Sequence, residues 1–189
     1  MEPMKATLVD SIRPGDWIYE IKLDGYRALA LRGGNQTRIL SRNQKDLGKK
    51  FQIIADSIAG LAVQDAVIDG EIVALDDKGR PSFQLLQGFD MGLVRSPIVF
   101  YAFDLLRLNG QDLRGLPIEE RKAKLAALLK NPPPAIRYSA SFTENIDALL
   151  AKVRELGLEG LVGKRAGSKY DSKRRARGSS SSFTNKVHL

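Results

Sequence analysis

The chain has 189 residues, 43% of them hydrophobic and 28% charged, with a net charge of +8, so it can bury one sizeable core. It has no cysteine and a single histidine, His188, which argues against a disulfide framework, a thiolate or multi-histidine metal site and a Ser-His-Asp triad. No apolar run approaches membrane-spanning length, and residues 1–5 lack the apolar core of a signal peptide, so we expect a cytoplasmic protein with no membrane partner.

The first third of the chain predicts a small antiparallel meander. Apolar runs at 17–21 and 26–31 flank Asp24-Gly25, where the aspartate offers local hydrogen bonds and Gly25 is expected to supply unusual backbone angles. A second tight turn at 33–35 leads into a third strand around 37–40.

The middle of the chain alternates helix and strand patterns. Residues 48–61 carry apolar side chains at spacings of three and four, which predicts an amphipathic helix. A β-branched run at 66–75 follows and ends in a turn at 76–79. This strand contains Asp69 and Glu71, whose burial is costly unless they are paired or functional, and it therefore indicates a site.

The second half predicts further elements in the same α+β mixture. The expected elements are a short helix at 82–87, a strand at 97–106, a helix opened by Pro117, a strand at 135–138, a helix at 142–156 with a Ser141-x-x-Glu144 capping box, and a last strand at 159–165. We expect one domain over residues 1–166 and a basic, Ser-rich segment over 167–189. Residues 164–189 hold 8 Lys or Arg and 1 acid, which suits a nucleic-acid partner or, equally, a solubilising end.

Residues 22–27 form the pattern Lys-x-Asp-Gly-x-Arg. A lysine at the end of a buried strand is poorly solvated, which favours its neutral, nucleophilic amine. Arg27 lowers the lysine pKa further and can hold phosphate. A hairpin with an exposed lysine is the alternative for this pattern taken alone.

Further short motifs follow this lysine in a fixed order across the chain. They are Ser41-Arg42, Asp69-Gly70-Glu71, the run 101–106 before Asn109-Gly110, the run 159–164, and Lys186. Together they resemble the adenylation domain of ATP-dependent DNA ligases, a superfamily shared with RNA ligases and capping enzymes. Pro-Met-x-Ala-Thr-Leu at 3–8 makes the bacterial ligase D group the most similar.

The resemblance implies how the nucleotide is held. Lys22 would attack the α-phosphate of ATP and hold AMP as a phosphoramidate. Glu20 would accept from the adenine amino group, which favours ATP over GTP. Glu71 would bind the ribose, and Phe103 would stack on the adenine, although a strand phenylalanine is usually ordinary core. Arg27 would contact ribose or phosphate.

The remaining implied roles concern phosphates and metal. Arg42 would bind the 5′-phosphate at the nick. Glu159 would coordinate Mg2+ or Mn2+, its alternative being a surface ion pair. Lys164 and Lys186 would neutralise phosphates. For Arg42 and Lys164 a solvated surface charge is the competing interpretation.

The implied fold is α+β, with two antiparallel β-sheets packed with helices and the ATP site between them, an ATP-grasp-like nucleotidyltransferase fold. In that family AMP passes to a DNA 5′-phosphate and the nick is sealed. The family's closing motif, Trp-x-Lys-x-Lys, is degenerate here, because 184–188 lacks the tryptophan and His188 replaces the second lysine. We also expect no OB-fold domain in this chain, so lysine adenylation is predicted and complete nick sealing by this chain alone is not.

Two alternatives stay open. One is an RNA ligase or capping-type nucleotidyltransferase. Against it, Glu20 and the run from 103–106 through Asn109-Gly110 favour adenine as the base and DNA as the substrate. The other is a non-catalytic nucleic-acid-binding remnant, against which the intact set of Lys22, Glu71 and Glu159 argues. The predicted partners are nicked or broken duplex DNA and other end-joining proteins, for a monomer that acts at the bacterial nucleoid.

Overall fold

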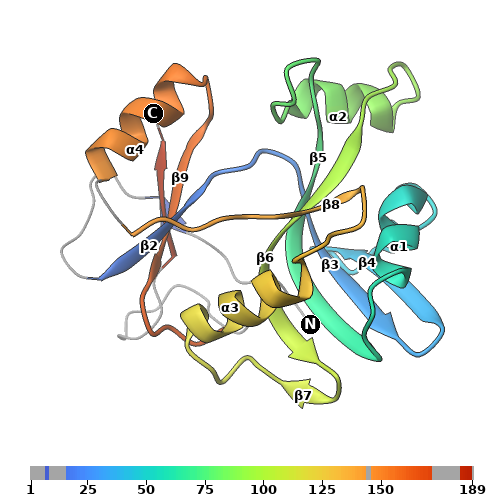
Figure 1. The fold of residues 1–189 in the computed structure, drawn as a ribbon. Coiled ribbons are helices and arrows are strands. Elements are labelled where there is room, and N and C mark those ends of the chain that lie inside the picture. The colour runs from blue at the N-terminus through green and yellow to red at the C-terminus, as the bar shows by residue number, and fades with distance from the viewer. Residues whose placement is uncertain (1–6, 9–15, 144–145, 172–183, 189) are drawn as a thin grey trace.

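Two β-sheets and four helices make up the described part of the chain, residues 7–8, 16–143, 146–171 and 184–188 of the computed structural model (Figure 1). The sheets stand beside each other as two walls, so the predicted α+β class with two sheets is confirmed. Within these ranges, each helix is too short or too polar to cross a bilayer.

The larger sheet has six strands and forms one wall. Its strands are β3 (Tyr26–Gly33), β4 (Gln36–Ser41), β5 (Asp65–Ala74), β6 (Ile98–Leu108), β7 (Gln111–Asp112) and β8 (Ile136–Tyr138). The order is β4-β3-β5-β6-β7 with antiparallel neighbours, and β8 adds to β6 in parallel. Asn109 and Gly110 turn β6 into β7 with positive φ angles of 46° and 84°, as their sequence predicts.

The helices α1 (Gln52–Ala59) and α2 (Phe83–Asp90) pack on this sheet, and an apolar core lies between them and the strands. Ile54 and Ile58 on α1 are fully buried, as are Ile68 on β5 and Phe100 on β6. Each such side chain stabilises the fold by about 1.5–3 kcal/mol relative to exposure. The helix predicted over 48–61 is shorter, because residues 48–50 form turns before it.

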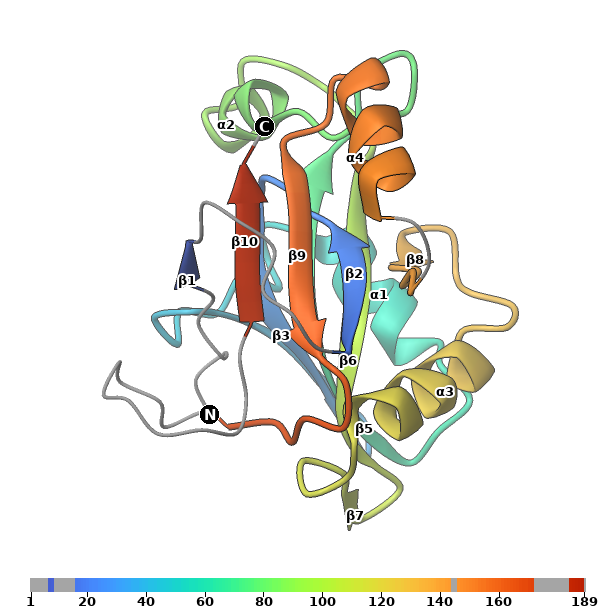
Figure 2. The same ribbon diagram turned by 90° about the vertical axis from the view of Figure 1, so that its left-hand side faces the viewer.

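The smaller sheet has four strands in the order β1-β10-β9-β2 (Figure 2). Its members are β1 (Thr7–Leu8), β2 (Trp17–Ile21), β9 (Gly160–Arg165) and β10 (Thr184–His188). The β9 strand pairs antiparallel with both β2 and β10, and β1 pairs parallel with β10. Strand β10 was not predicted, since 184–188 was assigned to the tail.

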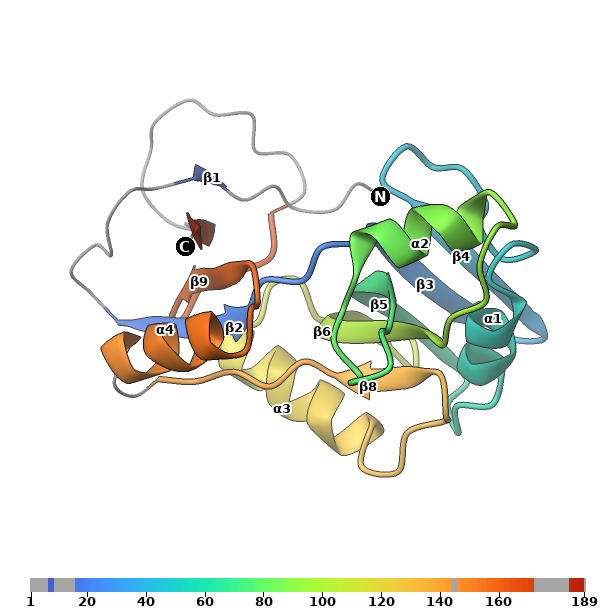
Figure 3. The same ribbon diagram turned by 90° about the horizontal axis from the view of Figure 1, so that it is seen from above.

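The predicted meander is wrong at its first turn. Strand β2 pairs with β9, while β3 pairs with β4 and β5, so residues 22–25 cross from one sheet to the other. Gly25 does not take a positive φ angle. It is required for another reason, because a Cβ there would lie 2.1 Å from the carbonyl oxygen of Ile72 on β5. The crossing runs between the walls (Figures 1 and 3).

The helix predicted over 142–156 begins later, as α4 (Ile146–Glu155). Phe142 instead forms a bridge with Tyr19 of β2, each backbone N–H donating to the other's carbonyl at 2.8 Å. The open edge of β2 thus takes the residue that the capping box would have placed in the helix; Glu144 of that box lies outside the described residues. Leu156, predicted to face inward, is 42% exposed.

Helix α3 (Ile118–Leu128) follows Pro117 as predicted and packs against β6. It lies along one side of both walls, in yellow in Figures 1 and 3. Its buried positions are Ile118, Arg121, Lys122 and Leu125. Two cations therefore occupy the face that a helical period assigns to the core.

Candidate active site

A cavity of about 880 Å³ opens where the chain crosses between the sheets. Seven of the residues predicted to form a site line it: Glu20, Lys22, Arg27, Arg42, Glu71, Phe103 and Lys164. Its size lies within the range of small-molecule sites, about 300–1,000 Å³. The structure therefore brings together residues that lie up to 144 positions apart in the sequence.

Lys22 lies at the end of β2, 8% exposed, beside the start of β9. Its backbone N–H donates to the carbonyl of Gly160 at 2.8 Å, which continues the β2–β9 pairing past Ile21 and Leu161. The same pairing brings Glu159 next to Lys22, and their side chains form an ion pair. The antiparallel register thus explains how two distant motifs meet.

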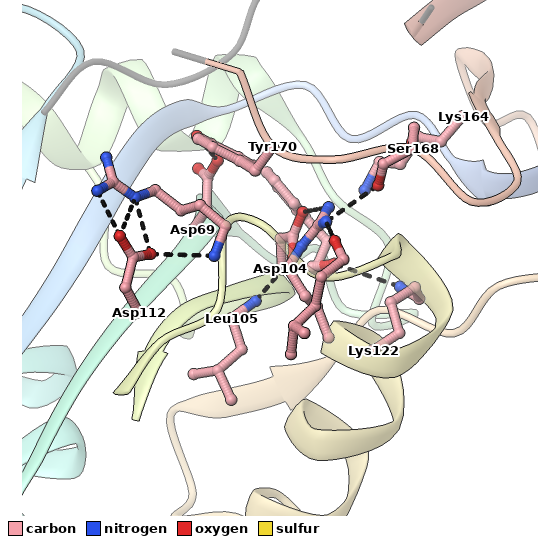
Figure 4. A network of polar contacts seen from close by, with 12 residues as sticks. Asp69, Asp104, Leu105, Asp112, Lys122, Lys164, Ser168 and Tyr170 are labelled. Carbon is pink, nitrogen blue, oxygen red and sulfur yellow. Dashed lines mark hydrogen bonds and ion pairs between the residues drawn. The ribbon is translucent and has the colours of Figure 1, made fainter. Parts of the chain in front are cut away.

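Arg27 and Asp69 form a bidentate ion pair on the wall of the cavity. Arg27 Nε donates to Asp69 Oδ1 at 2.6 Å, and a terminal nitrogen donates to Oδ2 at 2.7 Å. The Tyr170 hydroxyl donates to the same Oδ2 at 2.6 Å (Figure 4). Burial alone lowers the pKa of Arg27, but the contact with Asp69 outweighs it and raises that pKa above the ordinary arginine value. Arg27 is therefore permanently charged.

Phe103 lies half-buried on the cavity wall instead of in the apolar core. The Arg27 guanidinium lies 4.3 Å from its ring centroid and Lys164 Nζ lies 4.8 Å from it. These are cation–π distances. Glu71 lines the same cavity directly across the β3–β5 ladder from Arg27.

Gly70, between Asp69 and Glu71, permits this arrangement. A Cβ at this position would lie 2.3 Å from the Phe100 ring and 2.5 Å from the carbonyl oxygen of Tyr101. The β5–β6 register also shifts between Asp69 and Gly70. The glycine is thus required by close packing at an irregular point of the ladder.

Glu20 forms the centre of a buried charge cluster. It is 3% exposed, and its Oε1 accepts from Lys164 Nζ at 2.7 Å and from Lys122 Nζ at 2.9 Å. Burial lowers the pKa of Lys164; Glu20 opposes the shift and Lys122 adds to it. Lys164 is therefore no solvated surface charge, and it contacts Glu20 instead of standing free for phosphate.

Two predicted residues lie at the margins of the described site. Arg42 lines the cavity from the exposed turn after β4. Lys186 belongs to β10, opposite Val162 of β9, and its side chain lies outside what the structure describes.

The sequence did not lead us to predict a second set of buried charged side chains behind the cavity. Arg121 is fully buried and donates to both carboxylate oxygens of Asp104, at 2.8 and 2.9 Å. It also donates to the carbonyls of Leu116, at 2.6 Å, and Ser168, at 3.0 Å. Arg121 was detectable, because it falls on the apolar period of its helix. We find no sequence pattern that would have marked Tyr170.

The carboxylates fit a metal ion held mainly by its substrate. Within the described ranges, no three acidic or histidine side chains gather as a metal cage. Mg2+ characteristically binds through one or two carboxylates together with substrate phosphates and water. Glu159, beside Lys22 and 33% exposed, suits that mode.

Comparison with known proteins agrees with this geometry. The profile of the ATP dependent DNA ligase domain matches residues 3–179. The chain belongs to the ATP-dependent DNA ligase domain family. This ligase domain is 42% identical over 174 residues to the multifunctional non-homologous end joining protein LigD of Pseudomonas aeruginosa, covering 91% of this chain and 21% of that protein. It is 32% identical over 177 residues to the LigD of Mycobacterium bovis, covering 93% and 23%.

Solved ligase structures share the fold of this ligase domain. A mycobacterial DNA ligase D complexed with ATP and MES superposes with a TM-score of 0.80 at 29% identity, over 98% of this chain and 60% of that one. The ligase domain of Mycobacterium tuberculosis LigD gives 0.79 at 28% identity, over 99% and 59%. The chain thus spans about a fifth of its end-joining relatives and three fifths of these structures.

Proposed function

We propose that this ligase domain transfers AMP from ATP to Lys22, as the first step of sealing a DNA strand. The observation that carries the proposal is the position of Lys22 in a cavity lined by Glu20, Arg27, Glu71 and Phe103. The membership of the family and the ATP complex of a mycobacterial relative support it.

Lys22 acts as the nucleophile. Its Nζ forms a bond to the α-phosphorus as the bond to the leaving pyrophosphate oxygen breaks, and the proton of the amine passes to solvent. The ion pair with Glu159 must open before the amine can attack. Glu159 would hold Mg2+ or Mn2+, which supplies charge neutralisation on the phosphate oxygens.

Other residues of the cavity are proposed to bind the base, the sugar and the phosphates. We propose that Glu20 reads the adenine amino group, that Phe103 stacks on the ring, and that Glu71 binds the ribose. Arg27 is charged at every accessible pH and fixed by Asp69, so it supplies a preorganised cation near ribose or phosphate.

Three further cations have roles in this proposal. Arg42, exposed at the cavity margin, would bind the 5′-phosphate of the DNA. Lys186 would neutralise phosphate. For Lys164 the contact with Glu20 favours a role in holding the base-binding carboxylate, and a phosphate role requires that contact to break. Nicked or broken duplex DNA at the bacterial nucleoid is the proposed substrate.

The test is transfer of label from α-labelled ATP to the purified chain with Mg2+. We expect one AMP per chain in the wild type, no transfer in Lys22→Ala, and normal transfer in Lys49→Ala, an exposed lysine outside the cavity. Label retained by Lys22→Ala contradicts the proposal.

Two companion measurements separate the alternatives. Preferential labelling by α-labelled GTP would identify a capping-type enzyme. Salt-dependent DNA binding without covalent nucleotide, unchanged in Lys22→Ala, would identify a binding remnant.

A further inference from the structure

Helix α3 carries a buried lysine, Lys122, that belongs to none of the motifs identified in the sequence. Lys122 is 3% exposed, and its Nζ donates to Glu20 Oε1 at 2.9 Å, to the Ser139 carbonyl at 3.0 Å and to the Phe103 carbonyl at 3.3 Å. An ammonium group has three N–H donors, so these three acceptors match its full capacity. The position of Nζ is therefore fixed from three directions.

The three acceptors belong to both walls of the cavity. Glu20 is on β2 of the smaller sheet, Phe103 is on β6 of the larger one, and Ser139 directly follows β8. Helix α3 lies against both walls (Figures 1 and 3). Lys122 consequently links the side chain of Glu20, which is proposed to read the base, to the backbone of Phe103, which is proposed to stack on it.

Both lysines of the cluster bind the same oxygen of Glu20. Lys164 and Lys122 donate to Oε1, at 2.7 and 2.9 Å, so neither of them occupies Oε2. Two ammonium groups at one oxygen oppose rotation of the carboxylate. An ionised oxygen only accepts hydrogen bonds, which suits the 6-amino group of adenine and opposes the 6-carbonyl group of guanine.

We propose that Lys122 is a positioning residue for nucleotide specificity: by holding Glu20 through Oε1 it presents Oε2 to the amino group of the adenine. This inference rests on the proposed function of the cavity. Lys164 lines the cavity itself, whereas Lys122 is not among the lining residues, so its influence on the nucleotide passes through Glu20 and Phe103.

The experiment compares two nucleotides that differ only in the group that Glu20 would read. Binding of ATP and of purine riboside 5′-triphosphate, which lacks the 6-amino group, is measured by calorimetry on the full chain. A hydrogen bond to a charged group predicts a wild-type preference for ATP of about ten- to a hundredfold. In Lys122→Met the preference falls by about three- to tenfold, because Lys164 alone still holds Oε1 and the carboxylate can rotate.

A matched control and a double variant distinguish positioning from a general loss of structure. Lys124→Met removes a half-exposed lysine of the same helix and keeps the wild-type ratio. Glu20→Gln also lowers the ratio, and adding Lys122→Met to Glu20→Gln lowers it no further, because the two residues act in series. If Lys122→Met does not fold, Lys122→Gln, which keeps an N–H donor without the charge, takes its place.

The possible outcomes distinguish a failure of the inference about Lys122 from a failure of the proposed function of the cavity. A wild-type ratio retained in Lys122→Met, with both affinities lowered equally, means a purely structural role and overturns the inference. An equal further loss in the Glu20→Gln background does the same. A wild-type chain that binds neither triphosphate and gains no AMP contradicts the proposed function itself.

Discussion

Two buried regions in the described part of this ligase domain differ in the chemistry of their side chains. Beneath the six-stranded sheet, the core consists of fully buried apolar side chains such as Ile54, Ile68 and Phe100. Between the sheets, a cluster of buried charged groups contains Glu20 with two lysines, and Asp104 with Arg121. The apolar region stabilises the fold, and the charged region holds the cavity walls in fixed geometry at a cost in desolvation.

The difference predicts different responses to mutation. An apolar core loses stability in proportion to the volume removed. A buried ion pair is all-or-none, because removing one partner leaves the other charge uncompensated.

Arg121→Met is expected to lower the free energy of unfolding by about 3–5 kcal/mol, because it leaves Asp104 buried without its cation. The measurement is urea denaturation followed by circular dichroism. Arg121→Met combined with Asp104→Leu should recover most of the loss, since no lone charge remains. A small loss in the single variant would show that Asp104 is stabilised by other groups.

Tyr170→Phe is expected to lower the free energy of unfolding by about 1–3 kcal/mol, through loss of the hydroxyl bonded to buried Asp69. We also expect a weaker affinity for ATP, because Asp69 positions Arg27. The ATP effect should vanish in Arg27→Ala, measured by the same titration. If the effects of the Tyr170 and Arg27 substitutions on ATP affinity are additive, Tyr170 does not act through the arginine.

Ile68→Val removes one methylene from a fully buried side chain of the apolar region. The expected loss is about 0.5–1.5 kcal/mol, with the preference for ATP over its analogues unchanged. Equilibrium denaturation and nucleotide titration together check it. A changed nucleotide preference here would mean that the two regions are not separable.

Arg114→Ala breaks an ion pair with Asp112 on the surface, where the two side chains are 39% and 55% exposed. The expected change in the free energy of unfolding is below about 1 kcal/mol. A thermal melt at low and at high salt is sufficient to measure it. If Arg114→Ala lowers the free energy of unfolding as much as Arg121→Met does, burial does not explain the large effect of Arg121→Met.

The contrast also explains what could be predicted from the sequence. Apolar periodicity located α1, α3, β5 and β6, and the resemblance to ligases named residues that the structure gathers around one cavity. Periodicity says nothing about which strands pair, so β2 was assigned to a hairpin with β3 when its partner β9 lies far along the chain.

The charged layer was missed for a physical reason. A lysine or arginine on a helix is usually solvated, so Lys122 and Arg121 attracted no attention. Their burial depends on acceptors that other elements supply, including Glu20, Asp104 and the Ser139 carbonyl. Such acceptors become visible only when the sheets are assembled.

The most direct test of the account is the intact mass of the purified chain and the mass of its Lys22 peptide. The protein is first treated with pyrophosphate and Mg2+ to remove any AMP already bound, and then incubated with ATP or GTP. We predict one added AMP on Lys22 with ATP, none with GTP, and its removal by pyrophosphate. No adduct, or one on a different residue, would contradict a nucleotidyl-transfer site centred on Lys22.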